Sequence, residues 1–329
     1  MRTRGTILAA LILLSMITLS QSLNPPMISS IEQMKFYANS DQNEPEEINW
    51  ELIQTISKDS VVFTQGLEIH DEIIYESGGL YGHSSIRSFD LGSGVPIDTL
   101  NISSELFAEG LTIYDGEIIL LTWKSGRVLR YSMDFESNNE SVIPGEGWGI
   151  CSFNDKFAIS DGSSKITFRN PTDLMEISSI DVKLNGESLD KINELECVGD
   201  KIYANRWYDN RIFEIDIESG IVTAYFDFSL LVDEHGSSIS GEVLNGIAFD
   251  SSSGDFWITG KNWSNFHRIS IVVEDNTLID NFQVTYLIGI LITFGIVFPF
   301  LGFFFYSIKE PKGIQALATL GRLGGAPNG

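Results

Sequence analysis

Polar side chains that can transfer protons or stabilise charge recur along this chain in one short pattern. The pattern is a polar residue, usually a glycine, and then an apolar residue, at the start of a short strand-like run. Its five copies are Gln65-Gly66-Leu67, Glu109-Gly110-Leu111, Glu146-Gly147-Trp148, Asn193-Glu194-Leu195 and Asn245-Gly246-Ile247. Successive copies are 44, 37, 47 and 52 residues apart, and periods of this length are typical of repeat architectures.

Carboxyl, amide, indole and ammonium groups would meet if these copies were brought together with Trp123, Trp207 and Lys261, which lie outside them. Glu109 and Glu146 would raise each other's pKa at close range, and burial against aromatic rings would raise both further. A carboxyl group with a raised pKa can accept and donate protons near neutral pH. Lys261, together with the amides, is suited to stabilise a developing oxyanion. Three tryptophans can wall an apolar pocket around these groups, namely Trp123, Trp148 and Trp207.

A repeated set of strand-like runs predicts how these groups are positioned. Each copy begins a run that is followed by three more in the first four units, whereas the fifth unit has three runs in all. Radial repeats of four-stranded sheets form a β-propeller, so we predict an all-β fold with five blades over residues 48–275. An unassigned run at residues 49–56 is expected to supply the missing strand and close the ring. The regular period and the missing strand disfavour a large β-sandwich or barrel.

The propeller architecture predicts that the recurring residues share one face. The first strand of every blade lines the central channel, so the polar residues of the five copies should form one ring at a channel mouth. The second strand runs antiparallel to the first, and its end returns to that mouth. The residues at these ends are Glu76, Trp123, Asp161, Trp207 and Lys261. Asn245 is interpreted as a contact between blades rather than as a catalytic group.

The composition excludes some classes of function. The 329-residue chain has a formal net charge of −24, which argues against nucleic-acid binding because that binding needs clustered Lys and Arg. Four scattered histidines show no metal-ligand spacing, and we predict no metal site and no cofactor. Cys151 lies one place beyond the position equivalent to Cys197 in the repeat, so the two side chains should point to opposite faces. We therefore predict two free, mostly buried thiols, with a disulfide as the alternative.

The two ends of the chain have the composition of targeting segments. Residues 1–22 combine two arginines, an apolar run and small residues, which indicates a signal peptide, with an uncleaved anchor as the alternative. Residues 23–47 are predicted to be a linker or arm. A juxtamembrane linker at 276–283 precedes residues 284–308, whose uncharged run predicts a transmembrane helix. Basic residues in 309–329 predict a short cytoplasmic tail, so we expect a single-pass cell-membrane protein with an extracytoplasmic propeller.

A series of motifs between residues 50 and 269 carries a family resemblance. They are FTQGL, YESGGLYGHSSIR, FAEGLT, LTWK, GEGWGI, SDGSS, NELE, YANRW, LNGIAFD and TGKNW. In order and spacing they closely resemble the plant and bacterial type of glutaminyl-peptide cyclotransferase, also called glutamine cyclotransferase or glutaminyl cyclase. Linked motifs of this number are far more specific than any one of them.

The resemblance implies a fold, an activity and a set of roles. Members of the family are five-bladed propellers that convert an N-terminal glutamine into pyroglutamate and release ammonia, without the zinc of the animal type. By this resemblance Glu109 transfers the proton, while Asn193 and Lys261 act at the reacting amide. The substrate-binding candidates are Phe63, Gln65, Trp123, Glu146, Trp148 and Trp207. The implied partners are peptides or exported proteins with an N-terminal glutamine, and we expect a monomer.

Some features depart from the family or leave other functions open. Ala108 stands where glycine is usual, Cys197 stands where a larger residue is commoner, and the predicted membrane helix differs from the soluble plant members. A non-catalytic cell-surface propeller that binds peptides or glycans would keep the tryptophans but would not need Glu109 and Lys261 together. A metal-assisted hydrolase propeller would lose activity with a chelator, whereas the cyclase should not.

Overall fold

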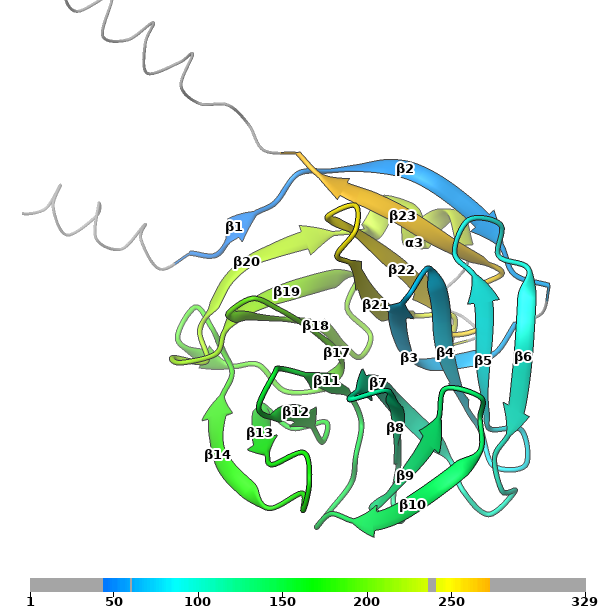
Figure 1. The fold of residues 1–329 in the computed structure, drawn as a ribbon. Coiled ribbons are helices and arrows are strands. Elements are labelled where there is room, and N and C mark those ends of the chain that lie inside the picture. The colour runs from blue at the N-terminus through cyan, green and yellow to red at the C-terminus, as the bar shows by residue number, and fades with distance from the viewer. Residues whose placement is uncertain (1–43, 60, 236–240, 273–329) are drawn as a thin grey trace, which may run out of the picture. The chain divides into compact units, whose positions relative to one another are not determined.

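Five β-sheets are arranged around a common centre in the computed structural model, which describes residues 44–59, 61–235 and 241–272 (Figure 1). Each of the five contains four antiparallel strands in the order expected of a propeller blade, and in four of them these strands are consecutive in the sequence. The five-bladed propeller predicted from the repeat is therefore confirmed.

The blades follow one another along the chain. Blade 1 contains β3 (Phe63–His70), β4 (Ile73–Gly79), β5 (Ser85–Asp90) and β6 (Pro96–Asn101). Blade 2 contains β7 (Ala108–Tyr114), β8 (Glu117–Thr122), β9 (Arg127–Ser132) and β10 (Ser137–Val142). Blade 3 contains β11 (Ile150–Ser152), β12 (Phe157–Ser160), β13 (Lys165–Arg169) and β14 (Glu176–Asp181). Blade 4 contains β17 (Ile192–Val198), β18 (Lys201–Arg206), β19 (Arg211–Asp216) and β20 (Val222–Asp227). Blade 5 contains β21 (Leu244–Asp250), β22 (Asp255–Gly260), β23 (Asn265–Ile271) and β2 (Trp50–Ser57).

The N-terminal strand β2 closes the ring by completing blade 5. β2 pairs antiparallel with β23, from Trp50 opposite Ile271 to Ser57 opposite Asn265, as the missing strand of the last repeat predicted. Lys58 follows β2 directly and is buried, with its Nζ 2.7 Å from Glu76 Oε1 in blade 1. The Glu76 carboxylate is thus held in an ion pair between blades, and the prediction that it belongs to the group of side chains at the channel mouth is wrong.

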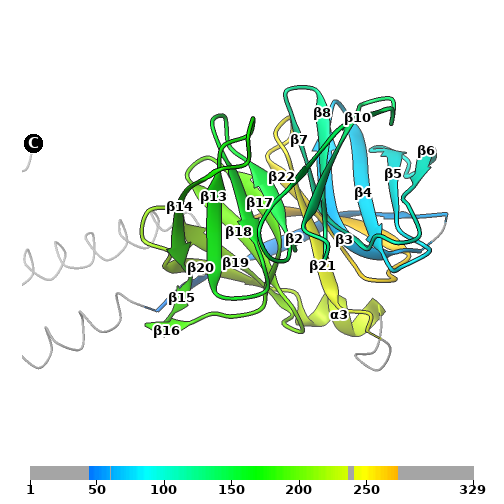
Figure 2. The same cartoon turned by 90° about the horizontal axis from the view of Figure 1, so that it is seen from below.

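Three smaller elements decorate the blades. β1 (Glu46–Glu47) pairs in parallel with β20 and adds a strand to blade 4, so the end of the segment predicted as a linker is part of a sheet. The hairpin of β15 (Lys183–Leu184) and β16 (Glu187–Ser188) and the helix α3 (Ser229–His235) connect an outer strand to the next inner strand. Both lie on the same side of the ring (Figure 2).

Apolar runs in the middle strands form the core between blades. In β8, alternate side chains point to opposite faces of the sheet. Ile118 and Leu120 pack toward blade 1, while Ile119 and Leu121 pack against blade 3. Because a middle strand is covered on both faces, its sequence is a continuous apolar run rather than an alternating one. The outermost strands, by contrast, are mostly exposed, as in β10.

Glycines allow the inner strands of neighbouring blades to approach closely. A Cβ added at Gly66 would lie 2.5 Å from the Leu111 nitrogen, and one at Gly110 would lie 2.8 Å from the Gly149 Cα. One added at Gly149 would lie 2.0 Å from the Asn193 carbonyl oxygen. Gly149, and not Gly147, is therefore the equivalent glycine of blade 3. The third copy of the sequence pattern is displaced by two residues from the one predicted, and Trp148 takes the place assigned to Glu146.

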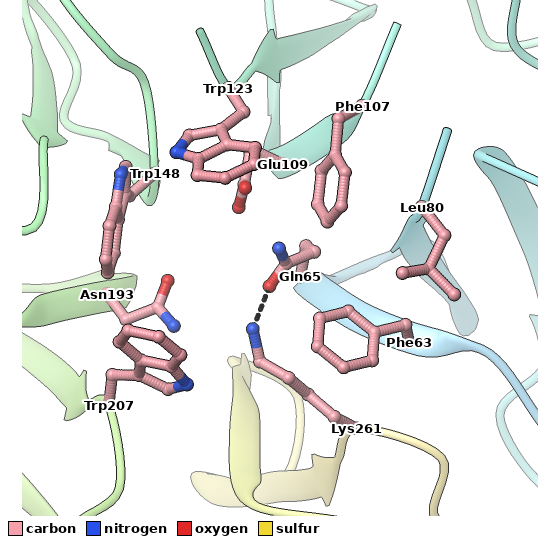
Figure 3. A pocket seen from close by; sticks show the side chains of 10 residues that line it. All are labelled: Phe63, Gln65, Leu80, Phe107, Glu109, Trp123, Trp148, Asn193, Trp207 and Lys261. Carbon is pink, nitrogen blue, oxygen red and sulfur yellow. Dashed lines mark hydrogen bonds between the residues drawn. The ribbon is translucent and has the colours of Figure 1, made fainter. Parts of the chain in front are cut away.

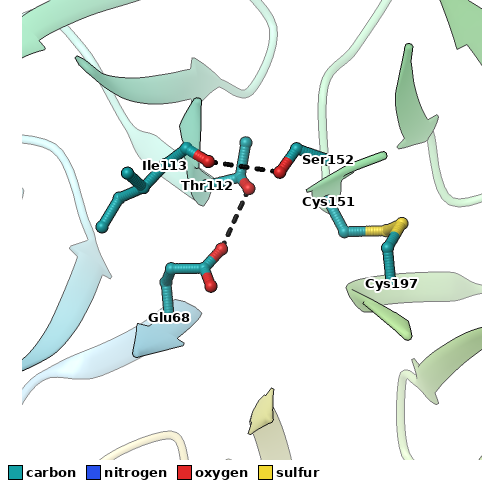
Figure 4. Close-up of a disulfide and its surroundings, with 6 residues drawn as sticks. All are labelled: Glu68, Thr112, Ile113, Cys151, Ser152 and Cys197. Carbon is teal, nitrogen blue, oxygen red and sulfur yellow. Dashed lines mark hydrogen bonds between the residues drawn. A yellow bond between two sulfur atoms is a disulfide. The ribbon is translucent and has the colours of Figure 1, made fainter. Parts of the chain in front are cut away.

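The two cysteines form a disulfide, which corrects the prediction of free thiols (Figure 4). Cys151 on β11 and Cys197 on β17 have Cα atoms 5.4 Å apart, within the range that a disulfide bridges. The prediction applied the alternation of faces that holds within one sheet. These strands belong to neighbouring blades and lie side by side around the channel, so residues one place apart in the repeat can meet.

The remaining predictions on chain organisation concern residues that the structure does not describe. The signal peptide at 1–22, the linker at 276–283, the membrane helix at 284–308 and the tail at 309–329 all lie outside the described residues. The part of the chain that is described contains no helix with the length and apolarity that a bilayer crossing requires.

Candidate functional site

A pocket of about 220 Å³ opens at the channel mouth where first strands begin and second strands end (Figure 3). Its lining residues are Phe63, Gln65, Leu80, Phe107, Glu109, Trp123, Trp148, Asn193, Trp207 and Lys261. They come from the four blades 1, 2, 4 and 5 and from the entry to blade 3. The site therefore exists because the repeat brings equivalent strand ends to one face.

Eight of the nine residues predicted for the site line this pocket. They are Phe63, Gln65, Glu109, Trp123, Trp148, Asn193, Trp207 and Lys261. Gln65, Glu109 and Asn193 occupy equivalent places on their inner strands, and Trp148 holds that place in blade 3. Asn245 has the corresponding place in blade 5, where its Nδ2 donates a hydrogen bond to the Thr64 carbonyl oxygen at 3.0 Å. This is the contact between blades that the sequence predicted.

Glu109 is a buried acid that faces a buried lysine. Its side chain is 4% exposed, and burial raises the pKa of its carboxyl group well above the usual value. The positive charge of Lys261 opposes this shift, and the negative charge of Glu146 adds to it. A carboxyl group in this condition holds its proton more tightly than one in water, so its carboxylate is a stronger base.

Lys261 completes the charged part of the site from the opposite wall. Burial lowers the pKa of its ammonium group to about 8, and the Glu109 carboxylate partly offsets the shift. Its Nζ donates a hydrogen bond to Gln65 Oε1 (Figure 3) and lies 4.6 Å from the centre of the Phe63 ring. The ammonium group is thus held at a defined place in the pocket and is mostly charged at neutral pH.

Asn193 supplies a buried amide whose oxygen is free for a ligand. The side chain is 2% exposed, and its Oδ1 has no hydrogen-bond partner among the described residues. The inner strand holds it in place, because the Asn193 carbonyl oxygen accepts a hydrogen bond of 2.6 Å from Ser160 Oγ. A buried polar atom without a partner carries a free-energy cost, which a bound polar group can remove.

Aromatic rings form the walls of the pocket. The ring centres of Trp148 and Trp207 are 5.8 Å apart, and those of Phe107 and Trp123 are 5.4 Å apart, both in edge-to-face contact. Such contacts fix ring orientation and exclude water. The pocket is therefore apolar around its rim of rings and polar where Glu109, Lys261 and Asn193 converge.

Sequence reasoning did not assign two of the lining residues, Phe107 and Leu80. A signal was present for the first, because Phe107 precedes Glu109 by two residues just as Phe63 precedes Gln65. Gly79 leaves room for the Phe107 ring, since an added Cβ there would lie 2.3 Å from Phe107 Cε1. Leu80 follows β4 with a φ of 96°, and no repeat position distinguishes it.

Glu146 is the predicted site residue that does not line the pocket. Its Oε2 accepts hydrogen bonds from the indole nitrogens of Trp123 at 2.7 Å and Trp148 at 3.0 Å. One carboxylate oxygen thus holds two walls of the pocket that come from different blades. Glu146 contacts the pocket through these indoles and through its charge on Glu109.

Two further acids, the buried Glu194 and the half-buried Glu68, lie along the same inner strands, outside the pocket. Glu194 accepts hydrogen bonds from the backbone nitrogens of Ile247 at 2.8 Å and Leu67 at 3.4 Å. Burial raises the pKa of Glu68 to about 7, and Thr112 Oγ1 donates to its Oε2 at 2.9 Å. Within the described residues, no three His, Cys, Asp or Glu side chains are grouped so as to hold a metal ion.

Comparisons with known proteins agree on one family. Residues 27–271 match the family model described as glutamine cyclotransferase. A glutaminyl-peptide cyclotransferase of Arabidopsis thaliana is 29% identical over 231 residues, which cover 67% of this chain and 71% of that protein. The crystal structure of the glutaminyl cyclase of Myxococcus xanthus superposes with a TM-score of 0.65 at 33% identity, covering 70% of this chain and all of that one.

Proposed function

The chain belongs to the glutamine cyclotransferase family, and from this membership we propose that it is a glutaminyl-peptide cyclotransferase. In this proposal it converts an N-terminal glutamine into pyroglutamate and releases ammonia. The observation that carries the proposal is the convergence of Glu109, Lys261 and Asn193, all buried, in one aromatic pocket. The pocket volume of about 220 Å³ suits one amino-acid residue rather than a longer peptide.

Binding in this pocket would fold the glutamine back on itself. The neutral α-amine must reach the δ-carbon of its own side-chain amide, and a snug pocket with fixed aromatic walls favours that conformation. Holding the reacting atoms together supplies the proximity contribution to catalysis. The three indoles and the two phenylalanines exclude the water that would otherwise compete for the polar groups.

Glu109 then acts as the proton-transfer residue. The nitrogen of the α-amine forms a bond with the δ-carbon, and the Glu109 carboxylate takes the proton that the amine loses. The resulting carboxylic acid gives this proton to the side-chain nitrogen as its bond to the δ-carbon breaks, and ammonia leaves. The raised pKa of Glu109 suits both steps, because the same group must accept and return one proton near neutral pH.

Lys261 and Asn193 stabilise the oxygen of the reacting amide in the tetrahedral intermediate. The oxygen gains negative charge as the amine attacks, and a buried ammonium group acts on it more strongly than one in water. The Asn193 amide nitrogen donates a hydrogen bond to the same oxygen, while its unpartnered Oδ1 accepts one from the substrate. The reaction as written transfers an acyl group within one molecule and needs no metal ion.

The setting of the enzyme belongs to the same proposal. A signal peptide at 1–22 would direct export, and a membrane helix at 284–308 would anchor a monomeric propeller on the extracytoplasmic side. The Cys151–Cys197 disulfide supports this, since disulfides persist in oxidising compartments. Peptides and exported proteins with an N-terminal glutamine would then be the substrates.

A mass measurement on the purified full-length chain tests the activity. A short peptide that begins with glutamine should lose about 17 Da, the mass of the ammonia that this intramolecular reaction releases. The loss should persist in a chelator and should not occur with a matched peptide that begins with asparagine. An unchanged mass with correctly folded protein would favour a non-catalytic propeller that binds peptides or glycans, and a loss abolished by chelator would favour a metal-assisted reaction.

A further inference from the structure

We propose that the mouth of the pocket carries a second subsite, formed by Leu80, Tyr81, Trp207 and Tyr208, which binds the side chain of the residue after the N-terminal glutamine. The subsite takes large apolar and aromatic side chains in preference to small or charged ones. This inference rests on the proposed function and adds a substrate class to it.

The size of the pocket requires that the second residue lie at the mouth. A space of about 220 Å³ holds one folded-back glutaminyl residue, and the buried charged groups lie at its polar end. The peptide bond that follows the glutamine must therefore point outward. The side chains around the opening would therefore contact the second residue of a bound peptide.

Exposed apolar side chains surround this opening. Leu80 and Tyr81 are 42% and 51% exposed, and Trp207 and Tyr208 are 37% and 60% exposed. Large apolar side chains that gather at a pocket are a feature of binding surfaces, whereas single exposed ones are ordinary. Leu80 and Trp207 also line the pocket itself, so the exposed surface is continuous with the site.

The four residues form two pairs that face each other across the mouth. Leu80 and Tyr81 directly follow β4 in blade 1, while Trp207 and Tyr208 directly follow β18 in blade 4. Leu80 and Trp207 lie on opposite sides of the pocket (Figure 3). A side chain that projects from the opening would thus meet apolar surface on two sides.

Ring contacts connect each tyrosine to the pocket wall. The Tyr81 ring centre lies 5.5 Å from that of Phe107, and the Tyr208 ring centre lies 4.9 Å from that of Trp207. The tyrosines therefore extend existing walls outward instead of standing apart from them. Aromatic rings provide large contact area with little loss of conformational entropy.

The backbone at both pairs is held in a conformation that side chains rarely adopt. Leu80 has a φ of 96° and Tyr208 a φ of 64°, and such residues cluster at binding and active sites. Hydrogen bonds fix the first turn, because His83 N and Ser84 Oγ donate to the Leu80 carbonyl oxygen at 2.9 and 3.0 Å. The two pairs are thus presented by turns with a defined shape.

The charged groups beside Tyr208 are paired with one another. Asp209 accepts hydrogen bonds from Arg211 at 2.9 Å and from Arg206 at 3.3 Å. A charged side chain held between Leu80 and Trp207 would meet apolar rings and, beside Tyr208, ion pairs that are already formed, so it would lose water contacts there without gaining a partner. The Lys124 ammonium group lies over the Trp123 ring, on the wall that blade 2 provides. The subsite therefore favours an apolar second residue over an acidic one.

Three peptides that differ at the second position test the subsite. Their sequences begin Gln-Phe, Gln-Gly and Gln-Asp and are otherwise identical. We expect the full-length chain to cyclise the Gln-Phe peptide with a kcat/KM about tenfold above that for Gln-Gly, from partial burial of the ring, and the Gln-Asp peptide to be slowest. In Tyr81→Ala and Tyr208→Ala the Phe-to-Gly ratio should fall toward one, because each variant removes part of the apolar surface that contacts the second side chain.

Met175→Ala is the matched control. Met175 is a large apolar side chain, 67% exposed, in the turn before β14 at the other end of the propeller. Its variant should keep the parent ratio. Equal kcat/KM for Gln-Phe and Gln-Gly in the parent, or an unchanged ratio in both tyrosine variants, would overturn the subsite and leave the cyclase activity standing. Failure to cyclise any of the three peptides would overturn the proposed function, and the subsite with it.

Discussion

Glu109 and Glu194 both project from inner strands of the propeller, but they differ in what surrounds their carboxyl groups. Each is buried, and burial raises the pKa of each well above its usual value. Glu194 accepts hydrogen bonds from the backbone of blades 1 and 5, whereas no described residue hydrogen-bonds the Glu109 carboxyl group, which faces the pocket. A buried acid with backbone partners joins blades, and one that faces a cavity is available to a substrate.

The largest effect on this comparison is expected from Glu109→Gln. The variant keeps the shape of the side chain but cannot accept the proton, so turnover should fall by about 10²–10⁴, the usual contribution of positioned acid–base catalysis. The thermal unfolding midpoint should stay close to that of the parent. Turnover near the parent value, measured by release of ammonia, would refute the role of Glu109.

Glu194→Ala should show the opposite pattern. Loss of the carboxyl group leaves the Ile247 and Leu67 backbone N–H groups without acceptors, which should lower the free energy of unfolding by about 1–3 kcal/mol. For a domain of this size that corresponds to a fall of several degrees in the unfolding midpoint. The kcat of the folded fraction should remain within about twofold, and a loss as large as that of Glu109→Gln would erase the distinction between the two acids.

Substitutions of Glu146 test whether this acid supports the pocket through its hydrogen bonds to the two indoles, although it does not line the pocket. In Glu146→Ala the indoles of Trp123 and Trp148 lose a shared acceptor, and kcat/KM should fall about tenfold, equivalent to roughly 1.4 kcal/mol. Glu146→Gln retains one oxygen and should recover most of that loss.

A further check on Glu146 comes from the indoles. The effect of Glu146→Ala should largely disappear in a background in which both tryptophans are phenylalanine, because those rings have no N–H to hold. Equal losses in the two backgrounds would show that Glu146 acts by another route.

The smallest effect expected is a change in pH profile. The pKa of Lys261 is lowered to about 8, so its charge is present below that pH and is lost as pH rises through it. The substrate amine becomes reactive as it loses its proton near pH ~8, so activity should rise and then fall on the alkaline side.

Substitution of Lys261 distinguishes the rising part of the pH profile, assigned to the substrate amine, from the falling part, assigned to Lys261. Lys261→Arg, which stays charged, should lose the falling limb even though its turnover is lower. Lys124→Arg is the control, because Lys124 lies over the Trp123 ring at 4.2 Å but outside the lining. A falling limb common to the parent and Lys261→Arg would assign it to another group.

Much of the site followed from the repeat because strand ends in a propeller have fixed places. The starts of first strands and the ends of second strands meet at one face, so Glu109, Asn193, Trp207 and Lys261 were brought together by position alone. The interpretation of Asn245 as a contact between blades followed in the same way. Phe107 was within reach of the same reasoning, since it repeats the spacing of Phe63 before Gln65.

Two wrong predictions, the position of the third copy and the free cysteines, concern contacts between neighbouring blades and not contacts between strands of one blade. The third copy of the pattern was set two residues early because the polar Glu146 precedes Gly147, as the pattern requires, whereas the apolar Trp148 precedes Gly149. Only the approach of Gly110 to Gly149 shows that Gly149 is the equivalent glycine. The disulfide was missed for a related reason, since the distance between Cys151 and Cys197 depends on how two inner strands turn about the channel.

The amino-acid sequence by itself determined the number of blades, their closure by the N-terminal strand and most of the residues at the pocket. These are consequences of periodicity, and periodicity is a property of the chain alone. The tertiary structure decided which residue of blade 3 faces the channel, that the cysteines are joined, and that Glu146 supports two indoles instead of lining the pocket. Each of these depends on distances between side chains of different blades, which come from packing and leave no regular trace in the order of residues.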